Sequence, residues 1–289
     1  MAPPRREGER RWIVLTSHPT LRTPRRLVDA GRRLGIAVEL REPPPRAAPD
    51  SAAGALLLAR PGTFSFVPLL REHRRLVVAG ADPLQPRRAL LDAGDKLRTL
   101  ARARSAGLAV PPTVVVRHPS QLRPALSLVA GPPWILKARR GSQGAQVVLA
   151  ASVDDAVRAA HLFWGTGASF LLQPDLRALG DVERHLVVHD RVVASAIARP
   201  APGEFRSNAH RGGRFCAIAP GSTPAAALAL RALQAVGLPL AAVDTIGERE
   251  PLLLEVNASP GLEALERATG RDLATPLLET LRAARAAHA

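Results

Sequence analysis

Short apolar segments alternate with amphipathic ones through roughly the first 90 residues of the chain. The apolar segments have the length of β-strands, and the segments between them have the spacing of helices that bury one face. We expect a helix over 23–35, which ends at Gly35, and a second helix around 66–74. The expected strands are 12–17, 37–42, 55–60 and 75–80. Strands that alternate with helices indicate a parallel, doubly wound α/β sheet.

The pattern changes after a long helical stretch over 87–107. Beyond it, strands follow one another with turns between them. They are expected at 110–116, twice within 133–150, at 170–174, as a hairpin over 182–199 that turns at His189 and Asp190, and at 241–247 and 251–257. One further helix is expected over 223–237, with Pro224 near its start and Gly237 at its end. Antiparallel strands with helices on one side indicate an α+β region.

The composition suits a protein with a sizeable core. The chain has 289 residues, of which 46% are hydrophobic, and this is enough for more than one domain. No apolar run approaches the ~18–20 residues that a membrane helix needs, so we expect no membrane contact. The Arg-rich start is followed by the apolar stretch 12–16, which is too short for a signal peptide. The lone Cys216 cannot form an internal disulfide, and we therefore expect a cytoplasmic protein.

The chain is strongly basic, and two interpretations of its charge stay open. Lys and Arg number 40 against 25 Asp and Glu, which gives a net charge of +15. The excess could attract an acidic or phosphorylated partner, or it could reflect a genome biased toward Arg, Ala and Pro codons. Basic residues are scattered, aromatic residues make up only 3%, and Tyr is absent. Because stacking platforms for single-stranded nucleic acid are scarce, we expect no nucleic-acid partner.

Two oxygen-bearing side chains stand at the end of the strand 251–257. Glu255 and Asn257 are two residues apart, so a strand projects both of them to the same face. Asp244 ends the neighbouring strand, and the few residues between the two strands suit a hairpin that pairs them. Oxygen ligands without Cys or His suit a hard cation, Mg²⁺ or Mn²⁺. The competing interpretation is a capping Asn beside two exposed acids.

A lysine and a glycine-rich turn lie inside 133–150. Lys137 interrupts an apolar strand, where an ammonium needs an anionic partner. The turn that follows would let backbone N–H groups approach a phosphate closely, and it consists of Gly141, Ser142, Gln143 and Gly144. Neither G-x-x-x-x-G-K-[ST] nor G-x-G-x-x-G is present. A plain hairpin turn is the competing interpretation, and the carboxylates above favour a phosphate site.

A third polar segment, 204–215, combines Arg206, Asn208, His210 and Arg211 with two glycines. Arginine is suited to bidentate binding of phosphate or carboxylate, although a solvated loop would have a similar composition. The motifs H-E-x-x-H, G-x-S-x-G and C-x-x-C are absent, so covalent catalysis by Ser or Cys has no support.

Taken in order, several segments resemble the ATP-grasp superfamily and, within it, the RimK-type glutamate ligases that modify a ribosomal protein. LLLEVNASPGLEALERATGRDLA at 252–274 is the most specific, and EFRSNAHRGG at 204–213 is nearly as good. Further matching segments are 95–115, 134–150, 185–194 and 241–244, whereas the N-terminal third matches only in pattern. The resemblance implies an ATP-grasp fold in which two α+β subdomains sandwich ATP. The expected parts are an N-terminal Rossmann-like parallel α/β domain at 1–90, a central subdomain at 91–171, and a C-terminal subdomain with the metal site at 172–289.

The resemblance also implies roles for individual residues. Two Mg²⁺ or Mn²⁺ ions would lie against the ATP phosphates and be bound by Asp244, Glu255 and Asn257. Lys137 and, further upstream, Lys96 would contact the nucleotide. The loop from Gly141 to Gly144 would close over the phosphates.

The catalytic residues expected on the same basis lie around the γ-phosphate and the acyl-phosphate. Arg206, Ser207 and Asn208 match the family triplet at that place. A family Arg-Arg pair is represented here by Ala198 and Arg199, so one acyl-stabilising guanidinium is missing. We expect Arg206, Asn208 and Arg199 to be catalytic.

The nucleotide contacts depart further from the family pattern. Gln173, Pro174 and Asp175 stand where the adenine edge would be bound, and Pro174 lacks the usual side-chain carboxylate. The acid expected at the ribose is Asp181, which is shifted by one residue, with Asp175 and Glu183 as alternatives. These departures argue against a copy of the ribosomal-protein enzyme.

The function implied is that of an ATP-dependent, ADP-forming carboxylate–amine ligase that works through an acyl-phosphate. It would join glutamate or another amino acid to an acidic protein, a peptide or a metabolite carboxylate. Two alternatives stay open: a peptide cross-linking enzyme of a natural-product pathway, and a catalytically inert ATP-grasp protein that binds ribosomes or RNA. We expect the protein to form a homo-oligomer, either a dimer or a tetramer.

Overall fold

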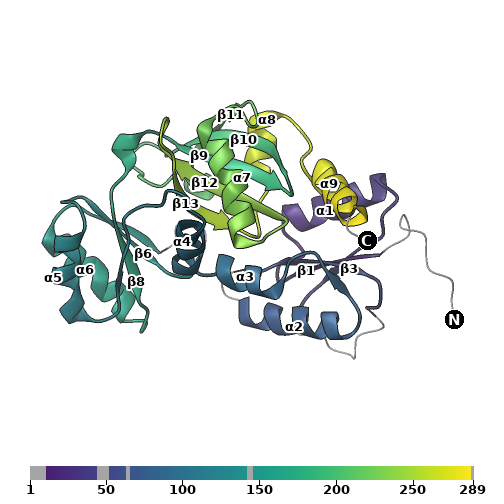
Figure 1. The fold of residues 1–289 in the computed structure, drawn as a ribbon, viewed down its shortest axis with the longest axis horizontal. Helices are drawn as coiled ribbons and strands as arrows, with labels where there is room; N and C mark the ends of the chain where they lie inside the picture. Colours follow the sequence, from purple (N-terminus) through teal and green to yellow (C-terminus); the bar gives the residue numbers. More distant parts are fainter. Residues whose placement is uncertain (1–10, 44–51, 63–65, 142–145, 288–289) are drawn as a thin grey trace.

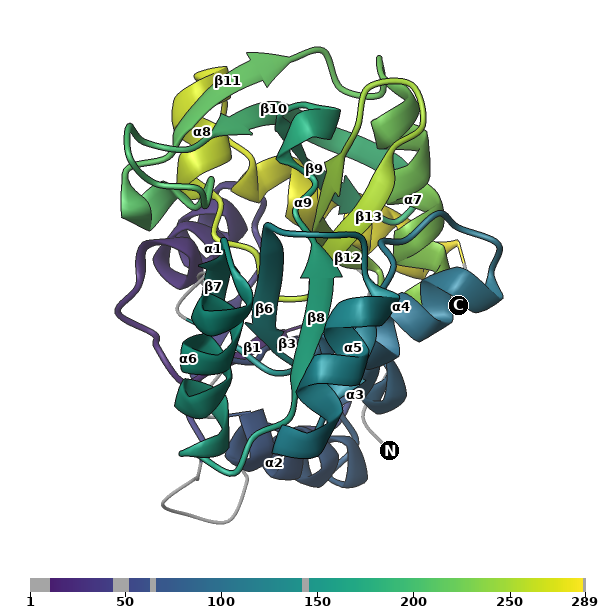
Figure 2. The same cartoon turned by 90° about the vertical axis from the view of Figure 1, so that its left-hand side faces the viewer.

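The computed structural model describes residues 11–43, 52–62, 66–141 and 146–287, and within them it contains three β-sheets with helices packed against them (Figure 1). The N-terminal and C-terminal sheets share two hydrophobic cores, whereas the middle sheet packs around a core of its own. The middle sheet lies at one end of the molecule, beside the C-terminal sheet (Figures 1 and 2). This arrangement confirms the expected sequence of a parallel α/β region followed by α+β regions.

The N-terminal sheet is parallel, in the order β2-β1-β3-β4, as the alternating pattern predicts. β1 and β3 are buried along their whole length, which is typical of parallel strands covered on both faces. Its strands and connecting helices are β1 (Trp12–Thr16), α1 (Arg22–Arg33), β2 (Val38–Arg41), β3 (Leu56–Arg60), α2 (Phe66–Val78) and β4 (Asp82–Pro83).

The strand expected at 75–80 is wrong, because α2 continues through Val78. Leu69, His73 and Leu76 are buried and spaced three or four residues apart, so the apolar run belongs to the inner face of a helix. A short apolar run suits either element, and its periodicity alone does not distinguish them. The chain turns at Gly80, whose φ is +91°, and the short strand β4 follows.

The long helix expected over 87–107 is divided into two helices, α3 (Arg87–Ala93) and α4 (Lys96–Ser105). The first ends at Ala93, with Gly94 as its C-cap. Asp95 caps the second, since its carboxylate accepts hydrogen bonds from the backbone N–H groups of Leu97 and Arg98. The break makes Lys96 the first residue of α4 and brings it beside β13.

The middle sheet is antiparallel, in the order β5-β8-β6-β7. Two helices that were not expected cover its outer face, as Figure 2 shows. The elements are β5 (Val114–Val116), a 3₁₀ turn (Pro119–Gln121), α5 (Leu122–Leu128), β6 (Trp134–Ala138), β7 (Val147–Ala150), α6 (Val153–Trp164) and β8 (Phe170–Pro174). β8 spans the expected boundary at 171/172 and pairs within this sheet, and the domain boundaries stay a prediction.

The C-terminal sheet is antiparallel, in the order β11-β10-β9-β12-β13. The predicted hairpin between β9 and β10 is confirmed, with His189 in its turn at a φ of +54°. The predicted pairing of β12 with β13 is confirmed as well. The elements are a 3₁₀ turn (Arg177–Leu179), β9 (Val182–Val188), β10 (Arg191–Arg199), a 3₁₀ turn (Ala209–Arg211), β11 (Arg214–Ile218), α7 (Pro224–Val236), β12 (Leu240–Ile246), β13 (Leu252–Asn257), α8 (Glu263–Thr269) and α9 (Ala274–Ala286). Across the described part of the chain, no helix is both long enough and apolar enough to cross a bilayer.

Candidate active site

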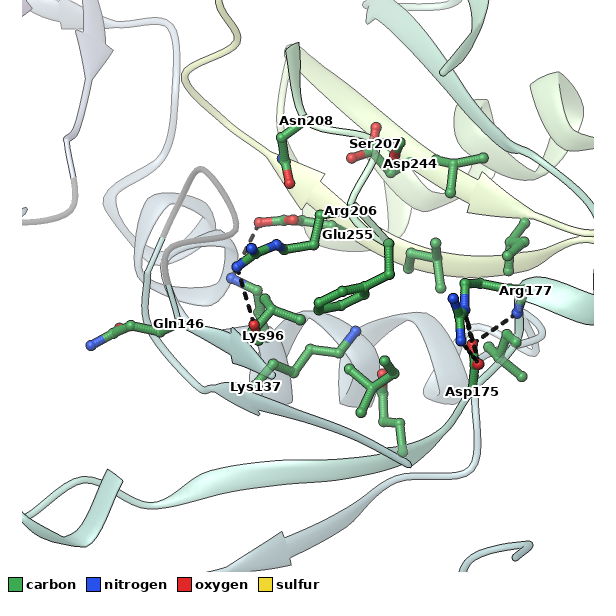
Figure 3. Close-up of a pocket in the computed structure, with 18 of the residues that line it drawn as sticks. Lys96, Lys137, Gln146, Asp175, Arg177, Arg206, Ser207, Asn208, Asp244 and Glu255 are labelled. Atoms are coloured by element: carbon green, nitrogen blue, oxygen red, sulfur yellow. Dashed lines mark hydrogen bonds and ion pairs between the residues drawn. The ribbon is translucent and has the colours of Figure 1, made fainter. Parts of the chain in front are cut away.

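A cavity of about 170 Å³ lies between the middle sheet and the C-terminal sheet (Figure 3). The middle sheet supplies side chains from β6, β7 and β8, and the C-terminal sheet supplies side chains from β9, β12 and β13. Lys96, Gly141, Gln146, residues 175–177 and the loop 205–208 complete the lining. The cavity has an apolar part, which includes Ile135, Val182 and Ile246, and a part rich in charged groups.

The charged part begins with two carboxylates on paired strands. Asp244 of β12 and Glu255 of β13 lie opposite each other in the antiparallel register, and the register shifts directly after this pair. Arg184 of β9 donates two hydrogen bonds to the Asp244 carboxylate, 2.7 Å from Nε and 2.6 Å from Nη2. Lys96 Nζ lies 3.2 Å from Glu255 Oε1 and donates a hydrogen bond of 2.7 Å to the backbone oxygen of Gly141. Each carboxylate therefore has a cation that fixes its orientation.

Glu255 is ionised although its side chain is partly buried. Burial acts to raise the pKa of its carboxyl, but the nearby positive charges of Lys96, Arg184 and Lys137 outweigh burial and lower the pKa below its usual value. The carboxylate is therefore available as an oxygen ligand for a cation at neutral pH.

Asn257 follows on the same strand but lies at the edge of the site. It lines a smaller cavity of about 80 Å³ that adjoins the first and shares Lys96 and Glu255 with it. Its Oδ1 accepts a hydrogen bond of 2.9 Å from the backbone N–H of Ser259. Within the described ranges no group of three His, Cys, Asp or Glu residues is placed to hold a metal. Two carboxylates and one carboxamide nevertheless fit Mg²⁺, which usually takes one or two protein carboxylates together with phosphate and water.

Lys137 occupies an alternate position on β6, where its neighbours Leu136 and Ala138 face the core of the middle sheet. Its side chain therefore points into the cavity, as Figure 3 shows. Burial and, next, repulsion from Lys96 lower the pKa of Lys137 to about 8, although Glu255 and Asp244 act in the opposite direction. An ammonium in this position favours a bound anion. Gly141 lies beside it with a φ of +145°, and Ser142, Gln143 and Gly144 lie outside the described residues.

The loop after β10 contributes Arg206, Ser207 and Asn208 to the lining, as the sequence suggested. Arg206 donates from Nε and Nη2 to the carboxylate of Glu204, at 2.9 and 2.7 Å. Its third nitrogen, Nη1, donates to the backbone oxygen of Val147 at 3.3 Å. Arg206 thus connects the C-terminal sheet to β7 on the other side of the cavity.

The residues expected at the adenine edge also line the cavity. Gln173 is buried and donates from Nε2 to Thr113 at 2.8 Å. Pro174 follows, and Asp175 accepts hydrogen bonds from Arg177 Nε at 2.9 Å and from Nη2 at 2.6 Å. Burial tends to raise the pKa of Asp175, but the hydrogen bonds and the charge of Arg177 lower it overall.

Two of the predicted residues line neither the larger nor the smaller cavity. Asp181 and Arg199 are exposed and pair with each other, with Nε of Arg199 2.7 Å from Oδ2 of Asp181. Glu183 accepts a hydrogen bond from Thr223 and lies outside the lining too. Of the three acids considered for the ribose, Asp175 is therefore the one that lines the cavity.

Sequence reasoning missed Arg184, Glu204 and Arg177. Arg184 had a detectable signal, because it is a charged residue next to the apolar run 186–188 of a central strand. Its partner Asp244 becomes apparent only from the register between β9 and β12, in which the two residues are paired. Glu204 and Arg177 lie two residues from their partners, Arg206 and Asp175, and such local pairs are common on solvated loops.

Comparison with known proteins identifies the family. Residues 93–281, more than half of the chain, match the model of the RimK-like ATP-grasp domain. The chain is 35% identical over 284 residues to the "Probable alpha-L-glutamate ligase" of Citrobacter koseri (strain ATCC BAA-895 / CDC 4225-83 / SGSC4696), and this match covers 92% of the chain and 93% of that protein.

Two solved structures have the same fold. The D-cycloserine synthetase DcsG superimposes with a TM-score of 0.76 at 18% identity, over 95% of this chain and 99% of that one. The ATP-grasp ligase PsnB, complexed with a phosphomimetic variant of its minimal precursor, Mg and ADP, gives a TM-score of 0.68 at 21% identity, over 94% of this chain and 97% of that one. The chain therefore belongs to the RimK-like ATP-grasp family, and both the ATP-grasp fold and the ligase class expected from the sequence are confirmed.

Proposed function

We propose that the protein activates a substrate carboxylate with ATP and then joins it to an amino acid through an amide bond. The carboxylate oxygen attacks the γ-phosphorus of ATP and releases ADP. The amine then attacks the acyl carbon and releases inorganic phosphate. The observation that carries this proposal is the convergence of Lys96, Lys137, Asp244 and Glu255 on one cavity whose lining also contains apolar side chains.

The lining suggests how ATP lies in the cavity. The apolar side chains of Ile135, Val182 and Ile246 suit a purine base, and the backbone at Pro174 lies beside them. The phosphates lie toward Lys96 and Lys137. The positive charges of these two side chains repel each other, and a bound anion reduces that repulsion. Asp175 is the candidate for the ribose hydroxyls.

Mg²⁺ would be held by Asp244, Glu255 and Asn257, and when bound it would neutralise charge on the phosphates. Arg184 and Lys96 hold the two carboxylates in place. Arg206 would stabilise the negative charge that develops on the phosphoryl group in transfer, since its guanidinium lines the same end of the cavity. The second metal ion, the use of Mn²⁺, and the catalytic roles of Asn208 and Arg199 stay predictions.

We propose glutamate as the amine substrate, because the relative from Citrobacter koseri has the name of an alpha-L-glutamate ligase. The acceptor would be an acidic protein, peptide or metabolite, in keeping with the positive charge of the chain. The intact pair Asp244 and Glu255 argues against the catalytically inert alternative. The oligomeric state and the cytoplasmic location stay predictions.

The test is a screen of ADP formation. Purified protein is incubated with ATP, Mg²⁺, each amino acid in turn and a set of acidic and neutral carboxylate acceptors, and products are identified by mass spectrometry. We expect ADP release that requires both substrates and Mg²⁺, together with a product heavier than the acceptor by one amino-acid residue. ADP formation at the same rate with and without the amine and the carboxylate would contradict the proposal.

A further inference from the structure

Glu204 does not line the cavity, yet it makes a dense set of contacts with a residue that does. Its Oε1 accepts from the backbone N–H groups of Phe205 and Arg206 at 2.8 and 3.1 Å, and from Arg206 Nε at 2.9 Å. Its Oε2 accepts from Arg206 Nη2 at 2.7 Å and lies 3.7 Å from Arg211 Nη1. The carboxylate and the guanidinium of Arg206 thus form a bidentate pair inside one turn of the loop.

The pair is held as an ion pair. The hydrogen bonds from the side chain and backbone of Arg206 and from the backbone of Phe205 lower the pKa of Glu204 to about 2. The side chain of Glu204 is 18% exposed, and that of Arg206 is 19% exposed. Backbone N–H groups do not leave the carboxylate when the side chain of Arg206 moves, so Glu204 stays in place as a fixed anion.

The pairing determines which face of Arg206 is presented to the cavity. A guanidinium has five N–H donors in one plane, and Glu204 occupies the edge formed by Nε and Nη2. Nη1 is directed to the other side, toward β7, where it makes a hydrogen bond of 3.3 Å to Val147. This bond is longer than those to Glu204, and it is therefore the one that an anion in the cavity would replace most readily.

We propose that Glu204 is a positioning residue for the phosphoryl-transfer step, which it serves by fixing the plane and direction of the Arg206 guanidinium so that Nη1 faces the transferring phosphoryl group. The inference rests on the ligase function proposed above. A side chain as long as arginine would otherwise lose rotamer freedom when the phosphate binds, and the Glu204 pair removes that cost beforehand. Glu204 itself touches neither substrate.

The test compares Glu204→Gln, which keeps the shape and removes the charge, with Glu204→Asp and with the control Asp29→Asn. Asp29 also pairs with an arginine, Arg32, but on an exposed helix surface. We expect kcat for ADP formation by Glu204→Gln to fall by about 100-fold, the scale of a small misplacement of a catalytic group. Glu204→Asp should lie between the wild type and Glu204→Gln, and Asp29→Asn should match the wild type. Thermal unfolding of each variant identifies any that fails to fold.

Two further measurements separate positioning from a structural role. In the Arg206→Ala background, Glu204→Gln should cause no additional loss of kcat, because the residue acts through Arg206. Glu204→Gln should also weaken binding of AMP-PNP relative to ADP, since only AMP-PNP has the γ-phosphate. Wild-type kcat in Glu204→Gln, an added loss in the Arg206→Ala background, or an unchanged ratio of AMP-PNP to ADP affinity would each overturn the inference. If the wild type forms no ADP with any substrate pair, the proposed function fails, and the affinity ratio alone then decides the role of Glu204.

Discussion

Arg184 donates two hydrogen bonds to the carboxylate of Asp244, at 2.7 and 2.6 Å, across the register between β9 and β12. The two side chains are 20% and 14% exposed, so the pair is largely withdrawn from water. A bidentate guanidinium uses one lone pair of each carboxylate oxygen and leaves the others for a cation in the cavity. Arg184 therefore holds the Asp244 carboxylate in one orientation without blocking it.

Removing this guanidinium should destabilise the fold. Arg184→Ala leaves the carboxylate of Asp244 without its partner in a mostly buried position, and we expect a loss of about 3–5 kcal/mol in the free energy of unfolding. Urea denaturation measures this loss directly. Arg158→Ala is the control, because Arg158 pairs with Asp155 while it is 72% exposed. Equal free energies of unfolding in the two variants would mean that the pair of Arg184 and Asp244 contributes no more to stability than an exposed ion pair.

Glu255→Gln should remove metal-dependent turnover and keep the fold. The substitution preserves shape but removes the charge that Mg²⁺ needs, and we expect ADP formation to fall by about 100-fold. A titration of ATP affinity against Mg²⁺ provides a second readout, in which the wild type tightens with Mg²⁺ and the variant does not. Glu250→Gln, on the exposed turn before β13, should behave as the wild type. A Glu255→Gln variant with normal dependence on Mg²⁺ would refute the assigned metal site.

The affinity for ATP should depend on the protonation of Lys137. Burial and repulsion from Lys96 lower its pKa to about 8, so the ammonium loses its proton as the pH rises through about 8. Phosphates bind the charged form, and we expect the Kd for ATP to increase above that pH and binding to take up a proton. Between pH 8 and 10.5 the unfolded chain binds more protons at Lys137 than the folded chain does. The contribution of Lys137 to the free energy of unfolding therefore rises with pH in this range.

Calorimetry in buffers of different ionisation enthalpy measures the proton uptake. Lys137→Arg stays charged throughout this range and is the matched control, with a flat profile around pH 8. The same pH profile in both proteins would show that another group titrates.

The sequence predicted those parts of the site that depend on local pattern. Lys137 interrupts an apolar strand, and the structure places it on the cavity side of β6. The short turn between β12 and β13 brings Asp244 and Glu255 together. The sequence did not predict which basic side chain pairs with each carboxylate. Arg184 contacts Asp244 because β9 and β12 are paired, although the two residues are 60 positions apart in the sequence. Lys96 contacts Glu255 because a new helix begins at Lys96, after its cap Asp95.

The family positions carried over to the start of β9 and the end of β10 lie outside the cavity lining. Asp181 matches the family with a shift of one residue, and Arg199 lacks the neighbouring arginine of the family. In the structure the two side chains form an ion pair with each other on the surface. The strand expected at 75–80 failed for a different reason, because apolar residues on the inner face of α2 also form a continuous run in the sequence.

An acidic acceptor should be preferred, and the preference should weaken with salt. Arg206 and Arg211 lie in the loop beside the cavity, and Arg214 begins the strand that follows. Screening acts over ~8 Å at physiological ionic strength, so these partly exposed charges should respond to it. We expect kcat/KM for acidic acceptors to fall as salt rises, and kcat/KM for neutral acceptors to stay constant. Arg214→Gln should flatten the dependence and Arg104→Gln, eight residues beyond Lys96 on α4, should not. A neutral acceptor preferred at every salt concentration would contradict this prediction.

The acyl-phosphate is the central claim, and the fate of the carboxylate oxygen tests it most directly. An acceptor labelled with oxygen-18 in its carboxylate is incubated with the wild-type protein, ATP, Mg²⁺ and the amino acid, and the released phosphate is analysed by mass spectrometry. If the carboxylate attacks the γ-phosphorus, each phosphate released with an amide bond carries one oxygen from the acceptor. The account predicts one oxygen-18 per phosphate. Amide formation with unlabelled phosphate would contradict it.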